Sequence, residues 1–82
     1  MGYDLVRPVE VKLVINDLLG RHVRTLVDQR QQAGRYVVTW DSGNERGQLV
    51  ANGTFLYQLR VADPVKGMDG NLVQTRQMAL VR

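Results

Sequence analysis

The stretch NGTFLYQLRVA, residues 52–62, carries the clearest pattern in the chain and decides its fold class. The side chains on one face of this stretch are apolar or aromatic: Phe55, Tyr57, Leu59 and Val61. Gln58 and Arg60 fall on the opposite face. Alternation with a period of two predicts a β-strand buried on one side. Asn52-Gly53 is a strong tight-turn dipeptide, so we expect a turn directly before this strand.

A second alternating stretch lies nearer the N-terminus, at residues 9–16, where the odd-numbered positions are all apolar. Asp17 to Gly20 then interrupts the pattern with residues that favour a turn, which predicts a hairpin connection. The next strand is expected over residues 21–27. Val23 and Leu26 are out of phase for strict alternation there, which indicates a β-bulge.

The middle of the chain is expected to hold one strand between two loops. Residues 29–34 are polar and predict a loop. Tyr36, Val38 and Trp40 then fall on one face, and the indole N–H of Trp40 requires a partner if the ring is buried. Residues 41–47 are rich in turn-forming types and lead into a short segment at 48–51.

The end of the chain predicts a loop at residues 63–71, which contains Pro64 and an Asp-Gly pair, and a last strand at 72–82. In that strand Met78 and Leu80 share a face, with Arg76 and Arg82 at its rims. Six or seven short strands separated by turns predict an all-β fold, an immunoglobulin-like sandwich of antiparallel strands. We expect the domain over residues 9–82. Residues 1–8 are expected to be a leader or linker, and Met1-Gly2 is typical of an excised, recombinantly expressed fragment.

Composition narrows the range of functions. Eighty-two residues make one small domain, and little room is left for a buried active-site cleft once the core is filled. The chain has no cysteine, which excludes disulfides and thiolate metal sites. The formal net charge is +3, but basic residues are scattered among acidic ones, so we expect no nucleic-acid partner. No apolar stretch has the length of a membrane span and no signal-peptide pattern is present, so we expect no membrane insertion.

Residues able to carry chemistry are few. His22 is the only histidine and Ser42 the only serine, and they lie far apart in the sequence, so no nucleophile and base are expected together. We therefore expect no enzyme activity and no cofactor. The loop from Asp41 to Glu45 offers oxygen ligands for calcium, although turn chemistry accounts for the same residues and the spacing is not that of an EF-hand. The alternation of the aromatic residues places them in the core rather than on a stacking surface.

Four blocks in succession give the sequence a family resemblance. They are VKLVINDLLGRHVRTLV at 11–27, AGRYVVTWD at 33–41, NGTFLYQLRV at 52–61 and TRQMALVR at 75–82. Together they resemble the C-terminal sorting domains of the bacterial type IX secretion system. They are similar also to the allied immunoglobulin-like domain of the flagellar hook-capping protein. The stretch from Asp41 to Ala51 is longer than in compact sorting domains and is more like the hook-capping relative.

The resemblance implies a set of sorting residues: Gly53, Tyr57, Arg76, Met78, Leu80 and Arg82. On this basis we expect a non-catalytic domain that directs a covalently linked passenger protein through the type IX system of a Bacteroidetes-like bacterium. The implied partners are the secretion translocon and a sortase-like peptidase, and the implied destination is the cell surface or the exterior, reached through the periplasm and outer membrane. The alternative is a structural immunoglobulin-like module of a hook-capping type protein, or a spacer beside a secreted enzyme domain.

Overall fold

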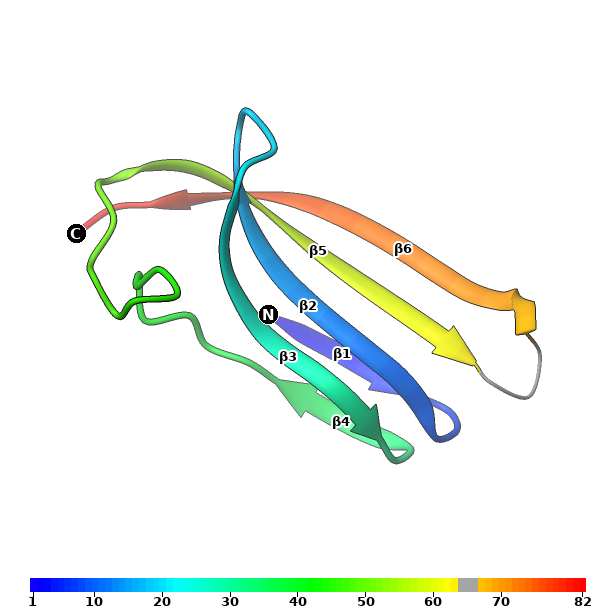
Figure 1. Cartoon of the computed structure of the whole chain (residues 1–82). Coiled ribbons are helices and arrows are strands. Elements are labelled where there is room, and N and C mark those ends of the chain that lie inside the picture. The colour runs from blue at the N-terminus through cyan, green and yellow to red at the C-terminus, as the bar shows by residue number, and fades with distance from the viewer. Residues whose placement is uncertain (64–66) are drawn as a thin grey trace.

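The computed structural model describes residues 1–63 and 67–82, apart from the side chains of residues 67–70. Within these residues it contains six strands: β1 (Gly2–Leu5), β2 (Val9–Asp17), β3 (His22–Gln31), β4 (Gly34–Val37), β5 (Gly53–Asp63) and β6 (Gly67–Leu80). All strand pairs are antiparallel. They form a four-stranded sheet in the order β3-β2-β5-β6 and a two-stranded sheet of β1 and β4 (Figure 1). The expected all-β sandwich is confirmed.

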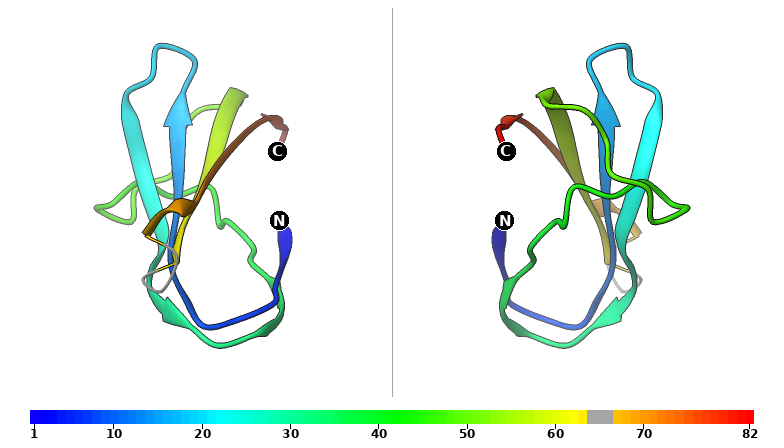
Figure 2. Two further views of the ribbon diagram at one scale, coloured as in Figure 1. Left: turned by 90° about the vertical axis from the view of Figure 1, so that its right-hand side faces the viewer. Right: turned by 90° about the vertical axis from the view of Figure 1, so that its left-hand side faces the viewer.

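The two sheets form separate layers, and the far end of β6 leans from the large sheet toward the layer of β1 (Figure 2). The core lies between the layers because the odd-numbered side chains of β2 and β5 face the small sheet. One buried cluster consists of Val9, Val11, Leu13 and Leu59. A second, nearer the β2–β3 turn, consists of Ile15, Trp40 and Phe55. Burial of these apolar side chains supplies the main driving force for folding.

The β2–β3 turn is held by one carboxylate. Asp17 Oδ1 accepts hydrogen bonds from the backbone N–H groups of Leu19 and Arg21, both at 2.9 Å. Gly20 adopts a φ of 83°, a conformation that glycine reaches without steric cost. The Arg21 backbone hydrogen bond is the main reason that the pKa of Asp17 lies below its usual value. The hairpin predicted at Asp17 to Gly20 is therefore confirmed.

The predicted irregularity in β3 is present twice. The register of β3 against β2 shifts by one residue at Leu26 and again at Val23. Neither residue has a partner on β2. Both side chains pack against the second cluster. The residues that break the sequence alternation are therefore the bulge residues, and each bulge turns an apolar side chain into the core.

Residues 1–8, expected as a leader or linker, instead contain strand β1. Tyr3 and Leu5 face the core and pack against the first cluster, while Gly2 and Asp4 are exposed. The Tyr3 ring stacks on Tyr36 of β4, with the ring centroids 5.4 Å apart. The expectation failed because four residues are too short a window for a convincing alternation.

The loop expected at residues 29–34 is also corrected, because β3 continues to Gln31. Gln29 and Gln31 lie opposite Val11 and Val9 of β2. Gln31 is buried, and its Oε1 accepts a hydrogen bond of 2.6 Å from the Tyr3 hydroxyl. Polar side chains are tolerated here because β3 is an edge strand and the buried amide has a partner.

The loop expected at residues 63–71 is replaced for the most part by a strand, since β6 begins at Gly67, opposite Asp63. Gly67 and Leu72 pair with Asp63 and Val61 of β5, with a register shift between the two pairs, and this pairing outweighs the turn-forming composition of the segment. The expectation for Pro64 falls outside the described residues. The last strand, predicted at 72–82, is confirmed to Leu80, as part of the longer β6.

Trp40 lies beyond the end of β4 and is 9% exposed. Its ring meets Phe55 edge to face, with centroids 5.2 Å apart. The indole N–H donates a buried hydrogen bond of 2.8 Å to the carbonyl oxygen of Gly43. The expected core position and the expected N–H partner are both found, and the bond fixes the start of the loop 41–51 against the core.

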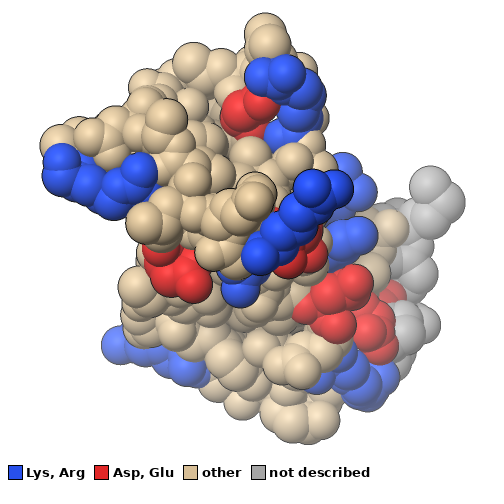
Figure 3. Space-filling view, turned by 60° about the vertical axis from the view of Figure 1, so that its left-hand side comes forward, with Lys and Arg blue, Asp and Glu red and all other residues tan. Residues whose placement is uncertain are grey.

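Charged side chains are dispersed over the surface. On the face shown in Figure 3, groups of Lys and Arg are separated from one another, with Asp and Glu between several of them. The described residues include no helix that is long and apolar enough to cross a membrane.

Candidate functional site

The residues implied by the resemblance are brought together on the β5–β6 hairpin. Gly53 lies opposite Leu80, and Tyr57 lies opposite Arg76. Met78 faces Phe55 across the same pair of strands. Residues that are 19 to 27 positions apart in sequence therefore share one surface, because an antiparallel hairpin returns the chain alongside itself.

Three of these side chains have a clear structural role. Met78 and Leu80 are half-buried and pack against the second cluster, as the sequence predicted. Tyr57 is half-buried and contacts both clusters. Truncating any of them removes apolar contacts from the core, so their effect on binding cannot be separated from their effect on folding.

The two arginines differ in their surroundings. Arg82 is bound at the end of the chain, where its backbone N–H donates to Asn52 Oδ1 at 3.2 Å and its guanidinium donates to the carbonyl oxygen of Val50. Arg76 is exposed. It borders a hollow of about 170 Å³ together with Met1, Tyr3 and other residues of β1, β2, β5 and β6. Of the two, Arg76 is the one available to an incoming partner.

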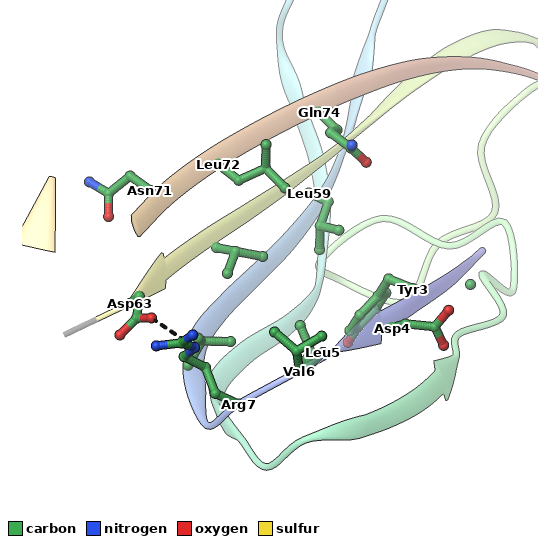
Figure 4. Close-up of a pocket in the computed structure, with 13 residues that line it drawn as sticks. Tyr3, Asp4, Leu5, Val6, Arg7, Leu59, Asp63, Asn71, Leu72 and Gln74 are labelled. Carbon is green, nitrogen blue, oxygen red and sulfur yellow. Dashed lines mark ion pairs between the residues drawn. The ribbon is translucent and has the colours of Figure 1, made fainter. Parts of the chain in front are cut away.

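A larger groove of about 520 Å³ continues from this hollow along β1. Leu59 and Leu72 project into it from the large sheet, and Tyr3 and Leu5 lie across from them on β1 (Figure 4). Leu72 is 48% exposed although it stands on the face of the sheet that carries the core. The small sheet covers β2 and β3 but leaves this part of β6 uncovered. We call this region, between β1 and β6, the open side of the sandwich.

One end of the groove is closed by an ion pair. Arg7 Nε lies 3.5 Å from Oδ2 of Asp63, a residue that is only 5% exposed. The dashed line in Figure 4 marks this contact. The groove was not expected from the sequence because one of its walls is β1, a strand that no alternation pattern predicted.

The opposite edge of the large sheet is covered. The loop 41–51 lies along β3, where the Glu45 backbone N–H donates to the carbonyl oxygen of Val23 at 3.2 Å and Glu45 Oε1 accepts from the Thr25 N–H. Arg24 donates to the carbonyl oxygen of Asn44 at 3.1 Å. The Thr25 hydrogen bond, with a smaller contribution from His22, lowers the pKa of Glu45. We call this edge, with its loop, the covered side.

The loop oxygens considered for calcium are used within the protein. Asp41 Oδ1 accepts from the Gly43 N–H at 2.9 Å, and Asn44 Oδ1 accepts from the N–H groups of Arg46 and Gln48. Across the described part of the chain, no three acidic or histidine side chains gather closely enough to hold a metal ion. These bonds agree with the turn chemistry that the sequence suggested for this loop.

The remaining candidates from the sequence lie near the covered side. His22 Nε2 is 3.4 Å from Thr25 Oγ1 and 3.5 Å from Glu45 Oε1. Ser42 is buried, with a φ of 69°, and its carbonyl oxygen accepts from the Val50 N–H. These contacts of His22 and Ser42 therefore serve to hold the loop in place.

Comparison with known protein families shows to which family the chain belongs. The model of the FlgD Ig-like domain matches residues 1–67, which include β1 to β5 and their loops. The chain belongs to the FlgD Ig-like domain family. Searches of curated proteins and of solved structures gave no match. The hook-capping half of the expected resemblance is thus confirmed, whereas type IX sorting stays a prediction.

Some of the candidate residues lie inside the segment that matches the FlgD Ig-like domain, and others lie outside it. Gly53 and Tyr57 lie inside the matched segment, and the match ends at Gly67, where β6 begins. Arg76, Met78, Leu80 and Arg82 lie beyond it. The family relationship therefore accounts for the sandwich and the β1 strand, and the surface of β6 has to be understood from its own geometry.

Proposed function

We propose that this FlgD Ig-like domain is a non-catalytic structural module of a larger, hook-capping type protein. The observation that carries the proposal is the family match across β1 to β5, which includes the small sheet and three of the four strands of the large sheet. The geometry supports it, because the described residues form a compact antiparallel core with one edge covered by its own loop. Such a module offers a rigid surface for assembly with other chains.

The test is domain replacement in the full-length protein. Residues 1–82 are exchanged for an unrelated immunoglobulin-like domain of similar size, and hook assembly is examined by electron microscopy. We expect assembly to fail while the rest of the protein remains folded by circular dichroism. Normal hooks with the replaced domain would contradict the proposal, because they would reduce this module to a spacer.

Type IX sorting is the second candidate, and one observation favours it: the implied sorting residues share the β5–β6 hairpin. In this alternative the domain guides a linked passenger through the translocon to the cell surface, where a sortase-like peptidase removes the domain. A reporter fused to residues 1–82 is expressed in a host with the type IX machinery. Surface delivery is the expected result, and a folded fusion retained in the periplasm would contradict sorting.

The sorting test has an internal control. Arg76→Glu alters an exposed guanidinium, and Arg46→Glu makes the same charge change in the exposed loop of the covered side. We expect Arg76→Glu to reduce surface delivery and Arg46→Glu to leave it unchanged, because charges at a docking surface govern encounter and orientation. Equal effects of the two variants would show that net charge, rather than β6, is recognised.

A further inference from the structure

We propose that the open side of the sandwich binds an extended peptide strand of a partner protein. The peptide runs antiparallel to β1, presents apolar side chains to the groove at every second position, and places an acidic residue beside Arg76. Binding would add a third strand to the small sheet, a known mode of peptide recognition. The inference goes beyond the proposed function because it assigns a site and a ligand chemistry.

The backbone of β1 has the hydrogen-bonding groups that this mode requires. The Met1 ammonium donates to the Val38 carbonyl oxygen at 3.0 Å, and the Val38 N–H donates to the Met1 carbonyl oxygen at 2.7 Å. In an antiparallel pair, residues with such mutual bonds alternate with residues whose N–H and C=O groups point away. By this rule the N–H and C=O groups of Gly2 and Asp4 point toward the free edge, because among the described strands β1 pairs only with β4.

The floor of the groove suits alternate apolar side chains. Val61 and Leu72 lie opposite each other on β5 and β6, and both line the groove together with Leu59 (Figure 4). Leu72 is 48% exposed, whereas Leu59 on the same face of the sheet is only 9% exposed. A strand beside β1 would lie over these side chains, and side chains that point the same way along a strand are two residues apart.

Charge fixes the position of the acidic residue within the peptide. At the Met1 end of the groove the Arg76 guanidinium forms no ion pair with any residue that the structure describes. At the other end Arg7 already pairs with Asp63. An antiparallel strand begins near Arg7 and ends near Met1, so its C-terminal part meets Arg76. A carboxylate at that position completes a pair that the domain lacks.

The probe is the acetylated, amidated heptapeptide VTVTVTE, in which valine and the final glutamate fall on one face. Two control peptides are matched to it: VTVTVTK reverses the charge, and VTVPVTE removes a central backbone N–H. Binding to the 82-residue chain is followed by amide chemical shifts and amide exchange in NMR spectra. We expect VTVTVTE to shift signals of β1 and β6 and to protect the Asp4 amide, and both control peptides to bind more weakly.

Variants of the protein test the backbone and the charge separately. A Cβ added at Gly2 meets only the Tyr36 carbonyl oxygen, at an ordinary 3.6 Å. Gly2→Pro removes the N–H that faces the groove, and Gly2→Ala keeps it. We expect Gly2→Pro to weaken binding roughly fivefold, as for the loss of one hydrogen bond, and Gly2→Ala to bind like the wild type. Arg76→Glu should reverse the preference, so that VTVTVTK binds more tightly than VTVTVTE.

Three results would overturn the proposal. The first is the absence of shifts at β1 with millimolar peptide, in a chain whose spectrum shows that it is folded. The second is equal binding by Gly2→Pro and Gly2→Ala. The third is protection of the Asp4 amide that rises with protein concentration alone, which would identify a second copy of the chain, and not a partner peptide, as the occupant.

Discussion

The two edge strands of the large sheet, β3 and β6, differ in whether their outer backbone edge is covered. On the covered side, β3 carries two bulges and the loop 41–51 bonds to its outer edge. On the open side, β6 pairs with β5 without a register shift from Leu72 to Leu80, and nothing in the described residues pairs with its other edge. Unpaired strand edges invite pairing with other chains, and proteins often blunt them with bulges or loops. The difference indicates that one side is protected and the other is available.

The comparison extends to the arginines at each edge. Arg24 of β3 is half-buried, donates to the Asn44 carbonyl oxygen and lies 3.6 Å from Asp41 Oδ1. Arg76 of β6 is exposed and forms no ion pair within the described residues. The same residue type therefore holds the protein's own loop on one side and faces solvent on the other.

The largest effect is expected from removing the open side altogether. Deleting residues 73–82 takes Met78 and Leu80 from the second cluster and leaves the backbone of β5 without a partner on that edge. We expect the truncated chain to lose cooperative unfolding and to aggregate, because β5 becomes an exposed edge. The cooperativity of unfolding is measured by thermal denaturation followed by circular dichroism. A sharp transition in the truncated chain would show that β6 is not part of the folding unit.

The covered side depends most on Trp40. Trp40→Ala removes a buried ring from contact with Phe55 and should lower the free energy of unfolding by about 3–5 kcal/mol. Because small domains have a total stability of only about 5–15 kcal/mol, much of the variant should be unfolded at 37 °C. Trp40→Phe is the control, since it keeps an aromatic ring but loses the hydrogen bond to Gly43. Chemical denaturation should place it between the wild type and Trp40→Ala.

The two arginines give a direct test of the comparison. Arg24→Ala should lower the free energy of unfolding by about 1 kcal/mol, since it breaks a partly buried hydrogen bond to the loop. Arg76→Ala should stay within about 0.5 kcal/mol of the wild type, as is usual for surface substitutions. Equilibrium denaturation of both variants under one set of conditions measures the difference. An equal loss at the two positions would remove the distinction between the sides.

The smallest effect is a pH dependence on the covered side. The folded protein holds the pKa of Glu45 below its usual value of 4.5, chiefly through the Thr25 N–H. The ionised carboxylate thus stabilises the fold above the unfolded pKa, and this contribution is lost as pH falls through the folded value. The Tm of the wild type should exceed that of Glu45→Gln at pH 6, and the two should converge as the pH falls through the lowered pKa of Glu45. A difference in Tm that stays constant with pH would contradict this role for Glu45.

Most of the fold could be predicted from the sequence, because alternation is strong where a strand is buried on one face. The patterns at residues 9–16 and 54–62 correspond to β2 and β5. Even the bulges of β3 could be located, since Val23 and Leu26 are apolar at positions that should be polar. These are local signals, and they need no knowledge of what each strand packs against.

The open side could not be predicted, for physical reasons. β1 is short, and the beginning of β6 consists of residue types that favour turns. β1 becomes a strand through pairing with β4, which is distant in sequence, and the beginning of β6 becomes one through pairing with the end of β5. The resemblance did point to the right hairpin, since Tyr57 and Arg76 lie opposite each other. It did not point to β1, whose free edge forms the other wall of the groove.

Amide hydrogen exchange at two single residues tests the central claim most directly. The Thr25 N–H points away from β2 but is held by Glu45, and the Asp4 N–H points toward the groove between β1 and β6. If one side is covered and the other open, Thr25 exchanges slowly and Asp4 exchanges at nearly the rate of an unstructured peptide. Equal protection of the two amides, or faster exchange at Thr25, would contradict the account.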